Sequence, residues 1–397
     1  MRKWISIIFL STVCLCAFSA EKGKTDLDAY YKYKVDYVET QRLYRNGRQL
    51  TLVTFKLEWP VSLCYSTQPL LQNTLCRQVF GVEGRSLSEG MSSYFSSLGE
   101  QIDKMPDEKW LTVTYYKCTL KMLGWEEGKY LSFQIHKTRR DNQSKEESVN
   151  ENKLYTYDLI KRKFLKRTDI ISSKYNPTKL PAYYEWKLGI FTRRQEMFLA
   201  DELSFFNVIQ PDERLCSVCV IPYGVVISMG DEVYLDDGEP TLHALPMGYV
   251  KKTLAKPVKR VLESTPLVVK SHSAQSPVVM MATDPAVGPD TTLVYDVVDQ
   301  MAQFQKGAAS LKKYFADELK YPEFETLTSK EGKVVVSFVV TRHGRIESPS
   351  VIIPCSPGID REAVRAVMAM PQWTPASHNG VAVNSRVTLP LNFSLEK

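Results

Sequence analysis

The chain has 397 residues, of which 44% are hydrophobic and 24% are charged; these proportions are those of a globular protein and exclude wholesale disorder. The length is enough for two or three domains. The formal net charge is only +6, and no basic stripe with interleaved aromatic residues is present, so the composition argues against nucleic acid as a partner. Aromatic residues reach 11% of the chain, which favours strand-rich structure.

The first residues have the pattern of a secretory signal peptide. Arg2 and Lys3 precede an apolar run of about 14 residues, and small residues follow at 17–20. As a helix, this run would span roughly 21 Å, which is less than the ~30 Å hydrocarbon core of a bilayer. We therefore expect residues 1–20 to be a leader that exports the protein, with a retained anchor or a lipid tether as the alternatives.

The cysteines beyond this leader do not define a redox site. Their even number permits disulfides in an oxidising compartment, but the pairing cannot be deduced from the sequence. The CxxC formed by Cys216 and Cys219 lies in a strand-like run that puts the two sulfurs on opposite faces, so we interpret both residues as small buried hydrophobes. The six are Cys64, Cys76, Cys118, Cys216, Cys219 and Cys355.

Residues 21–252 are predicted to form one mixed α/β module. Strand-like alternation recurs along it, and helical spacing is found at 70–81 and 91–105. The stretch 139–153 has almost no apolar residue, so we expect a solvated loop between two strands there. From 253 to 293, prolines recur among Val, Ser and Ala without an amphipathic period, which predicts a semi-extended linker.

Residues 294–397 are predicted to form a compact domain of element order α-β-β-α-β. Apolar residues at helical spacing precede Pro322, which predicts a first helix that ends there. Residues 332–353 indicate two strands joined by a His-Gly turn, and a second helix is expected to begin with Asp360 as its N-cap. With the final strand, this makes an α+β domain with a three-stranded antiparallel sheet and helices on one face. The residues expected on the buried face of the first helix are Ala308, Leu311, Phe315 and Leu319.

The last strand has a proline at its centre. Val387, Leu389, Leu391 and Phe393 fall on every second position, which is typical of a half-buried strand, but Pro390 has no backbone N–H to donate. Because main-chain groups point alternately to the two neighbouring strands, a proline fits where its own groups face open space. We therefore expect an edge strand. Such an edge is either protected by the proline or is a docking site for an added strand, and the pattern alone favours neither.

A set of short motifs lies in this C-terminal quarter of the chain. They are Tyr321-Pro322, the G-x-V-x-V-x-F-x-V strand 332–340, Asp360 with Glu362-Ala363, Pro371-x-Trp373-x-Pro375, Asn379-Gly380 and Leu389-Pro390-x-x-Phe393. Together they resemble the C-terminal domain of TonB-family proteins in its Bacteroidetes-like form. The segment 301–307 departs from the family, which has a Pro-rich turn at this place.

The resemblance implies a periplasmic domain that captures the TonB box, a short extended segment of outer-membrane transporters, by strand addition to its last strand. Members of the family act as energy transducers for transmembrane transport, and they transmit force through an N-terminal membrane anchor. If the leader of this protein is removed, no anchor remains, and the protein would be a box-binding module. A dimer formed by strand exchange is an alternative. The implied contact residues are Arg386, Val387, Thr388, Leu389, Pro390, Leu391, Asn392 and Phe393.

The N-terminal module has a resemblance of its own. Runs such as those at 155–171 and 205–230 are similar to a secreted module of unknown biochemical role that is shared by lysozyme-sensing anti-sigma factors and peptidoglycan deacetylases. This implies an alternative function, a secreted sensor that binds lysozyme or peptidoglycan through residues 21–252. In that case the C-terminal domain would only dimerise.

Catalytic, cofactor and metal motifs do not stand out. The five histidines are scattered without a second ligand type at metal spacing, and we expect them to be solvated. Ser310 and Lys313 match S-x-x-K, but they lie on an amphipathic helix without a supporting motif. Trp373, between two prolines, is expected to fill the core. The sequence therefore predicts a binding protein that is not an enzyme and needs no cofactor.

Overall fold

The computed structural model describes residues 32–64, 66–106, 110–142, 149–172, 216–221, 224–229, 242–263, 290–305, 307–322, 325–326 and 329–395. The predicted leader, with Cys14 and Cys16, lies outside these residues. The chain forms two compact units that are interleaved in sequence. Unit 1 consists of Met1–Val38, Trp59–Thr67 and Val269–Lys397, and unit 2 consists of Glu39–Glu58 and Gln68–Val268. The predicted division at 252/253 and 293/294 stays a prediction.

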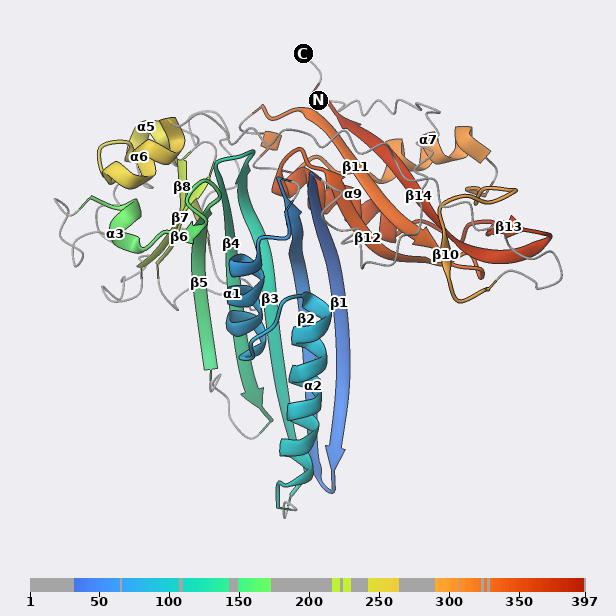
Figure 1. The fold of residues 1–397 in the computed structure, drawn as a ribbon, viewed down its shortest axis with the longest axis horizontal. Helices are drawn as coiled ribbons and strands as arrows, with labels where there is room; N and C mark the ends of the chain where they lie inside the picture. Colours follow the sequence, from blue (N-terminus) through green and yellow to red (C-terminus); the bar gives the residue numbers. More distant parts are fainter. Residues whose placement is uncertain are drawn as a thin grey trace, which may run out of the picture. The chain divides into compact units, whose positions relative to one another are not determined.

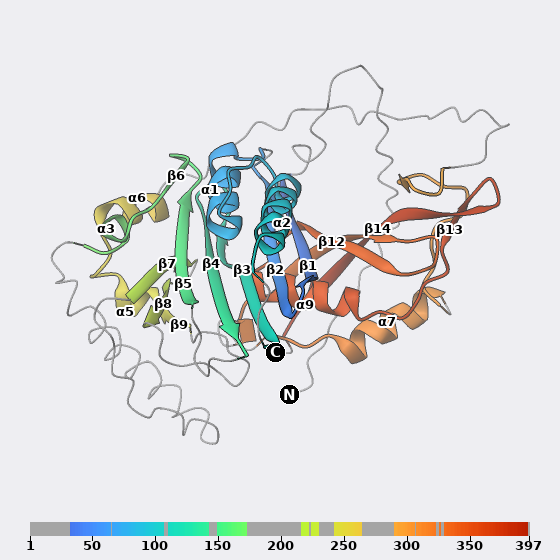
Figure 2. The same ribbon diagram turned by 90° about the horizontal axis from the view of Figure 1, so that it is seen from below.

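Unit 2 contains a mixed sheet with two helices on one face (Figures 1 and 2). Its strand order is β1-β2-β3-β4-β5-β6, and β7-β8-β9 form a second, antiparallel sheet. Strands β2 and β3 are parallel because the two helices connect them. The elements are β1 (Tyr33–Asn46), β2 (Gln49–Leu63), α1 (Pro69–Phe80), α2 (Leu87–Asp103), β3 (Thr112–Glu126), β4 (Tyr130–Asp141), β5 (Val149–Asp158), β6 (Lys163–Phe164), α3 (Arg167–Ile170), β7 (Cys216–Ile221), β8 (Gly224–Met229), β9 (His243–Pro246), α5 (Met247–Val250) and α6 (Lys256–Glu263).

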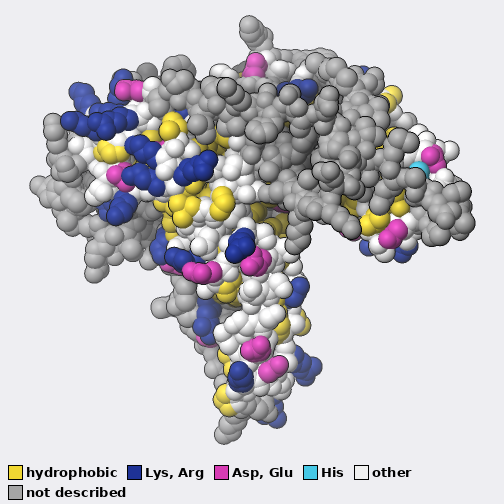
Figure 3. Space-filling view, viewed as in Figure 1, with side chains coloured by type: hydrophobic (Ala, Val, Ile, Leu, Met, Phe, Trp, Pro, Cys, Tyr) yellow, Lys and Arg dark blue, Asp and Glu magenta, His cyan; other side chains and the backbone are white. Residues whose placement is uncertain are grey.

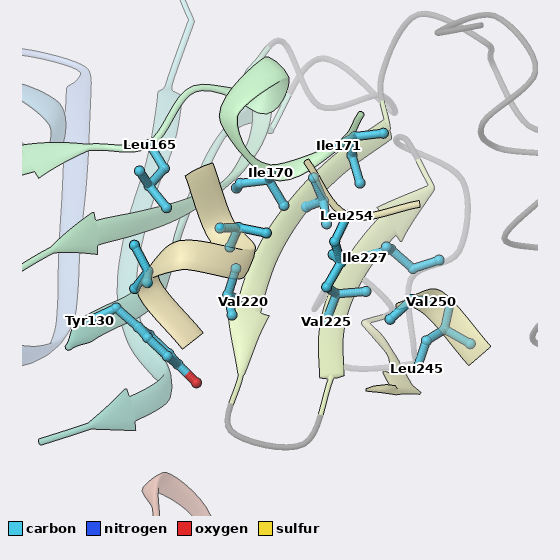
Figure 4. Close-up of a cluster of buried hydrophobic side chains, with 13 residues drawn as sticks. Tyr130, Leu165, Ile170, Ile171, Val220, Val225, Ile227, Leu245, Val250 and Leu254 are labelled. Atoms are coloured by element: carbon cyan, nitrogen blue, oxygen red, sulfur yellow. The ribbon is translucent and has the colours of Figure 1, made fainter. Parts of the chain in front are cut away.

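Two hydrophobic clusters hold unit 2 together. Under the helices, the fully buried Phe55 lies edge-on to Phe80, Tyr94 and Phe95, with ring centroids 5.1–5.7 Å apart. Between β4 and the second sheet, a cluster of thirteen buried side chains includes Tyr130 of β4 and residues of α3, β7, β8, β9, α5 and α6 (Figure 4). Val258 of α6 is one of them, so the first part of the predicted linker is a packed helix in the structure.

Unit 1 has an α+β fold, and α7, β11, β12, α9 and β14 follow the predicted α-β-β-α-β order. The short strands β10 and β13 are additional, and β10 is parallel to β14, so the sheet is not the predicted three-stranded antiparallel one. Its sheet has the order β10-β14-β11-β12, followed by the first residues of β1, and β13 pairs with β14 as a hairpin. Leu311, Phe315 and Leu319 are buried as predicted, whereas Ala308 is exposed. Its elements are β10 (Val294–Tyr295), α7 (Gly307–Glu318), β11 (Gly332–Val340), β12 (Ile346–Ile353), α9 (Pro357–Met368), β13 (Ala376–His378) and β14 (Val381–Phe393).

Two local predictions were wrong. Helix α9 begins one residue after Ser356, whose hydroxyl accepts a hydrogen bond from the Ile359 N–H, because Pro357 suits the first helical position. Asp360 instead lies in the first turn, where its carboxylate accepts from the Cys355 N–H at 2.8 Å. Both ends of the polar stretch 139–153 are strand and not loop: β4 extends to Asp141 and β5 begins at Val149, because one face of an antiparallel pair can be solvated. The middle of the predicted loop, residues 143–148, lies outside the described residues.

The far edge of the unit 1 sheet is closed by a segment from the other end of the chain. Val35 and Asp36 of β1 pair with Val351 and Ser350 of β12, and the Ser350 hydroxyl donates to the Asp36 carboxylate at 2.7 Å. Val35 has no exposed surface. Residues 33–38 are therefore part of the C-terminal unit, although about 250 residues of chain separate them from it.

We expect Val35→Ala in the full chain to lower the free energy of unfolding by about 2 kcal/mol, because it removes two buried methyl groups and leaves a cavity. The matched control is Ile353→Ala on β12, where the side chain is 51% exposed and the change should cost less than about 0.5 kcal/mol. Urea denaturation measures both values. Equal, small effects would contradict the placement of β1 in the core of unit 1.

Candidate functional site

The last strand, β14, carries the residues that the sequence singled out. It pairs antiparallel with β11 in one unbroken register, from Ser385 opposite Val340 to Phe393 opposite Gly332. The side chains of Leu389, Leu391 and Phe393 are buried, at 7%, 0% and 1% exposure. The predicted period of two is therefore confirmed, with these three side chains in the core and Val387 half-buried.

The position of Pro390 fixes which main-chain groups face away from β11. Pro390 lies opposite Val335 and cannot donate a hydrogen bond to it. In an antiparallel ladder, pairs that exchange hydrogen bonds alternate with pairs that do not, so Pro390 belongs to a pair whose main-chain groups point outward. By the same alternation, the groups of Arg386, Thr388 and Asn392 point outward. We call the outward main-chain groups of residues 386–393 the outer edge.

Before the outer edge, β14 pairs with two short strands, β13 along residues 381–383 and β10 along residues 384–385. Strand β10 runs parallel to β14, with Val294 opposite Asn384 and Tyr295 opposite Ser385. Beyond Ser385, no described strand pairs with the outer edge. The expected edge strand is thus an edge along residues 386–393, while its first part lies inside the sheet.

The segment that contains β10 is fixed by polar contacts. The Asn384 side-chain amide donates to the carbonyl oxygens of Thr291 (3.0 Å) and Leu293 (3.2 Å), and its oxygen accepts from the Arg342 N–H at 2.8 Å. The Arg386 guanidinium pairs with the Asp296 carboxylate at 3.0 Å. Of the predicted contact residues, Arg386 therefore already has an intrachain partner for its side chain.

Below the sheet, aromatic residues support the outer edge. Phe393 lies edge-on to Tyr321, and Trp373 lies edge-on to Phe338, each pair with ring centroids 5.6 Å apart. Trp373 fills the core as predicted, at 5% exposure. Burial raises the pKa of Tyr321 to about 12, so its hydroxyl stays protonated and donates to the Lys330 carbonyl at 2.6 Å. The strand is thus held on a rigid layer.

Other residues noted in the sequence do not gather into a site. His343 is exposed in the turn between β11 and β12, and His378 lies 3.4 Å from the Asp299 carboxylate. His136 is buried, contrary to expectation, because its ladder neighbour Asn152 donates to Ser228 and the second sheet covers this place. Within the described ranges, no three His, Cys, Asp or Glu side chains are grouped to hold a metal ion.

The family profile described as "Gram-negative bacterial TonB protein C-terminal" matches residues 317–395, from the end of α7 through β14. This match confirms that the C-terminal domain resembles that of TonB-family proteins. The matched residues include the whole outer edge. No helix in the described part of the chain has the length and apolar character to cross a membrane.

Solved structures provide two further similarities. A DUF3298 family member from Bacteroides fragilis NCTC 9343 is 14% identical, with a TM-score of 0.41, and the alignment covers 59% of this chain and 99% of that one. A DUF3298 family protein from Pseudomonas aeruginosa PAO1 is also 14% identical, with a TM-score of 0.34 and coverage of 56% and 95%. No curated protein matches the chain.

The direction of the main-chain groups can be tested with a pair of proline substitutions. Thr388→Pro removes an N–H that faces outward, so we expect a change in unfolding free energy of less than about 1 kcal/mol. Leu391→Pro removes an N–H that faces β11 and also a buried side chain, and should cost about 3 kcal/mol or more. Thermal denaturation of both variants checks this. Equal destabilisation would mean that the outer edge is assigned to the wrong side.

Cys355, at the N-terminus of α9, should be an unreactive thiol. It is the least buried of the cysteines whose side chains are described, yet burial raises its pKa to about 11. Since only the thiolate reacts and little of it forms below the pKa, alkylation at pH 7.5 should be at least about 100-fold slower than for a free cysteine and should accelerate up to pH 11. Mass spectrometry of iodoacetamide-treated protein measures this, with the urea-unfolded chain as the control. Rapid labelling of the folded chain at pH 7.5 would contradict it.

Proposed function

We propose that the protein is a TonB-like component of the Gram-negative cell envelope, exported to the periplasm, whose C-terminal unit captures extended segments of outer-membrane transporters. The profile match supports the envelope setting and the class of partner. The observation that carries the proposal is the outer edge: from residue 386 to 393, β14 has β11 on one side and no described strand on the other. The role proposed is one of binding, without catalysis.

The arrangement of the sheet directs strand addition to this edge. On the opposite side of the sheet, β12 is paired with Val35 and Asp36 of β1, and β10 is only two residues long. An incoming segment of six to eight residues would span roughly 20–26 Å of the outer edge at ~3.3 Å per residue. It would meet the N–H groups of Thr388 and Asn392 and the carbonyl oxygens of Thr388, Pro390 and Asn392.

These main-chain contacts set the scale of the affinity. About five hydrogen bonds at a net ~1 kcal/mol each amount to about 5 kcal/mol, before the cost of ordering the segment. This corresponds to a dissociation constant in the millimolar to high micromolar range. Strand addition of this kind is tolerant of sequence, because main-chain groups are the same for every residue. Tighter, selective capture requires side-chain contacts in addition.

Binding of synthetic TonB-box peptides to the mature full-length chain tests the proposal. Thr388→Pro removes one of the outward donors and should weaken binding about fivefold, whereas the matched Thr388→Ala keeps the donor and should stay within twofold of the wild type. Isothermal titration calorimetry provides the affinities. The proposal would be refuted if the wild-type chain retained neither the peptides in excess nor isolated transporter plug domains.

A further inference from the structure

Strand β10 determines where a captured segment must leave the sheet. It occupies the ladder positions opposite Asn384 and Ser385, directly next to the outer edge. A strand added along residues 386–393 cannot continue in the ladder beyond Arg386, because the hydrogen-bonding groups there are already paired. Its next residues have to leave the plane and pass over β10 or its immediate surroundings.

Large apolar side chains are exposed at this exit, in the same segment as the carboxylates of Asp296 and Asp299. Five large hydrophobic side chains that are 39–58% exposed lie on or beside β10 and the β13–β14 hairpin. Val294 pairs with Asn384, and Val381 pairs with His378 at the hairpin end. An isolated bridge between Gln300 and Ser377 keeps the intervening chain against β13. We call these residues the apolar strip: Leu293, Val294, Val297, Met301 and Val381.

The apolar strip is held in place without a partner. The Asn384 amide fixes the chain before β10, and the Asp296–Arg386 ion pair fixes the chain after it. Further on, the Asp299 carboxylate accepts from the Asn379 N–H at 2.6 Å. Figure 3 shows hydrophobic side chains at the surface in the region of β10. A preformed apolar surface of this kind costs little conformational entropy when a ligand covers it.

We propose that the apolar strip binds apolar residues that lie immediately outside the strand-forming stretch of the captured segment. This inference rests on the proposed function and specifies its ligand: an extended transporter segment with a short apolar flank on the side that leaves over β10. Two arguments support it. The strip is continuous with the outer edge, and main-chain pairing alone leaves the affinity weak, so side-chain burial at the exit supplies both strength and selectivity.

The test uses three synthetic peptides with the same six-residue stretch of alternating Thr and Val. One has a Val-Leu-Val flank before the stretch, one has it after the stretch, and one has Ser-Asn-Ser on both sides. Fluorescence anisotropy with the mature full-length chain gives their affinities. We expect one of the two apolar-flanked peptides to bind about tenfold more tightly than the polar-flanked peptide.

Two variants separate the apolar strip from the outer edge. The double variant Val297→Ser, Met301→Gln should reduce the preference for the apolar flank to less than twofold. The control Met368→Gln changes a side chain of similar exposure, 47%, at the end of α9 and should leave the preference intact. Thr388→Pro should weaken the binding of all three peptides. Because both strip positions are exposed, melting temperatures should stay within a few degrees of the wild type.

The outcomes distinguish the two proposals. If the wild-type chain binds none of the peptides, the proposed function fails. If it binds all three equally, strand addition stands and the role of the apolar strip is overturned. The strip proposal is also overturned if sedimentation shows a dimer that the double variant dissociates while peptide affinities stay unchanged, because the strip would then be covered by a second copy.

Discussion

The fold of the C-terminal unit depends on a hydrogen-bond ladder that is complete on one side of β14 and open on the other. The ladder to β11 is unbroken over nine residue pairs, and Leu389, Leu391 and Phe393 below it are buried, with Phe393 edge-on to Tyr321. Pro390 is compatible with this arrangement only at an outward position, since an inward position would require a donor that it lacks. One residue therefore reveals the side on which the strand is open.

Other pairings within unit 1 limit the positions at which a further strand can join the sheet. Val35 and Asp36 pair with β12 at the far edge, and β10 pairs with Asn384 and Ser385 of β14, directly before the outer edge. Both closing segments come from outside the stretch that matches the family profile. The outer edge is thus a short stretch of free main chain with an ion pair, Asp296–Arg386, at one end. Its length suits an extended segment and not a large sheet.

Much of unit 1 was predictable from the sequence because the information is local. The period of two in residues 387–393, the apolar spacing before Pro322 and the turn at His343 each lie within a few residues, and each was confirmed except for Ala308, which is exposed. Pro390 also predicted that the last strand is an edge strand, and this prediction is correct for residues 386–393. Motif spacing then gave the family resemblance that the profile match confirms.

The sequence could not reveal the pairings that join distant segments. Nothing near Val35 indicates that its partner is Val351, and a two-residue strand such as β10 has no period to detect. The helix start was misplaced because Asp360 and Ser356 are both good capping residues, and only the position of Pro357 separates them. The strand residues at the two ends of 139–153 were predicted as loop, because a solvated strand face lacks the apolar alternation that identifies strands.

The proline also bears on whether protection and docking exclude each other at this edge. If two copies of the chain paired outer edge to outer edge, the combined ladder would contain Pro390 twice and lack two donors. A foreign strand without proline would lack only one. The difference, one hydrogen bond of about 1 kcal/mol, favours the foreign strand over self-pairing roughly fivefold. A single proline on the outward register therefore disfavours self-pairing more than it disfavours the pairing of a foreign strand, so protection from other copies is compatible with the proposed capture at this edge.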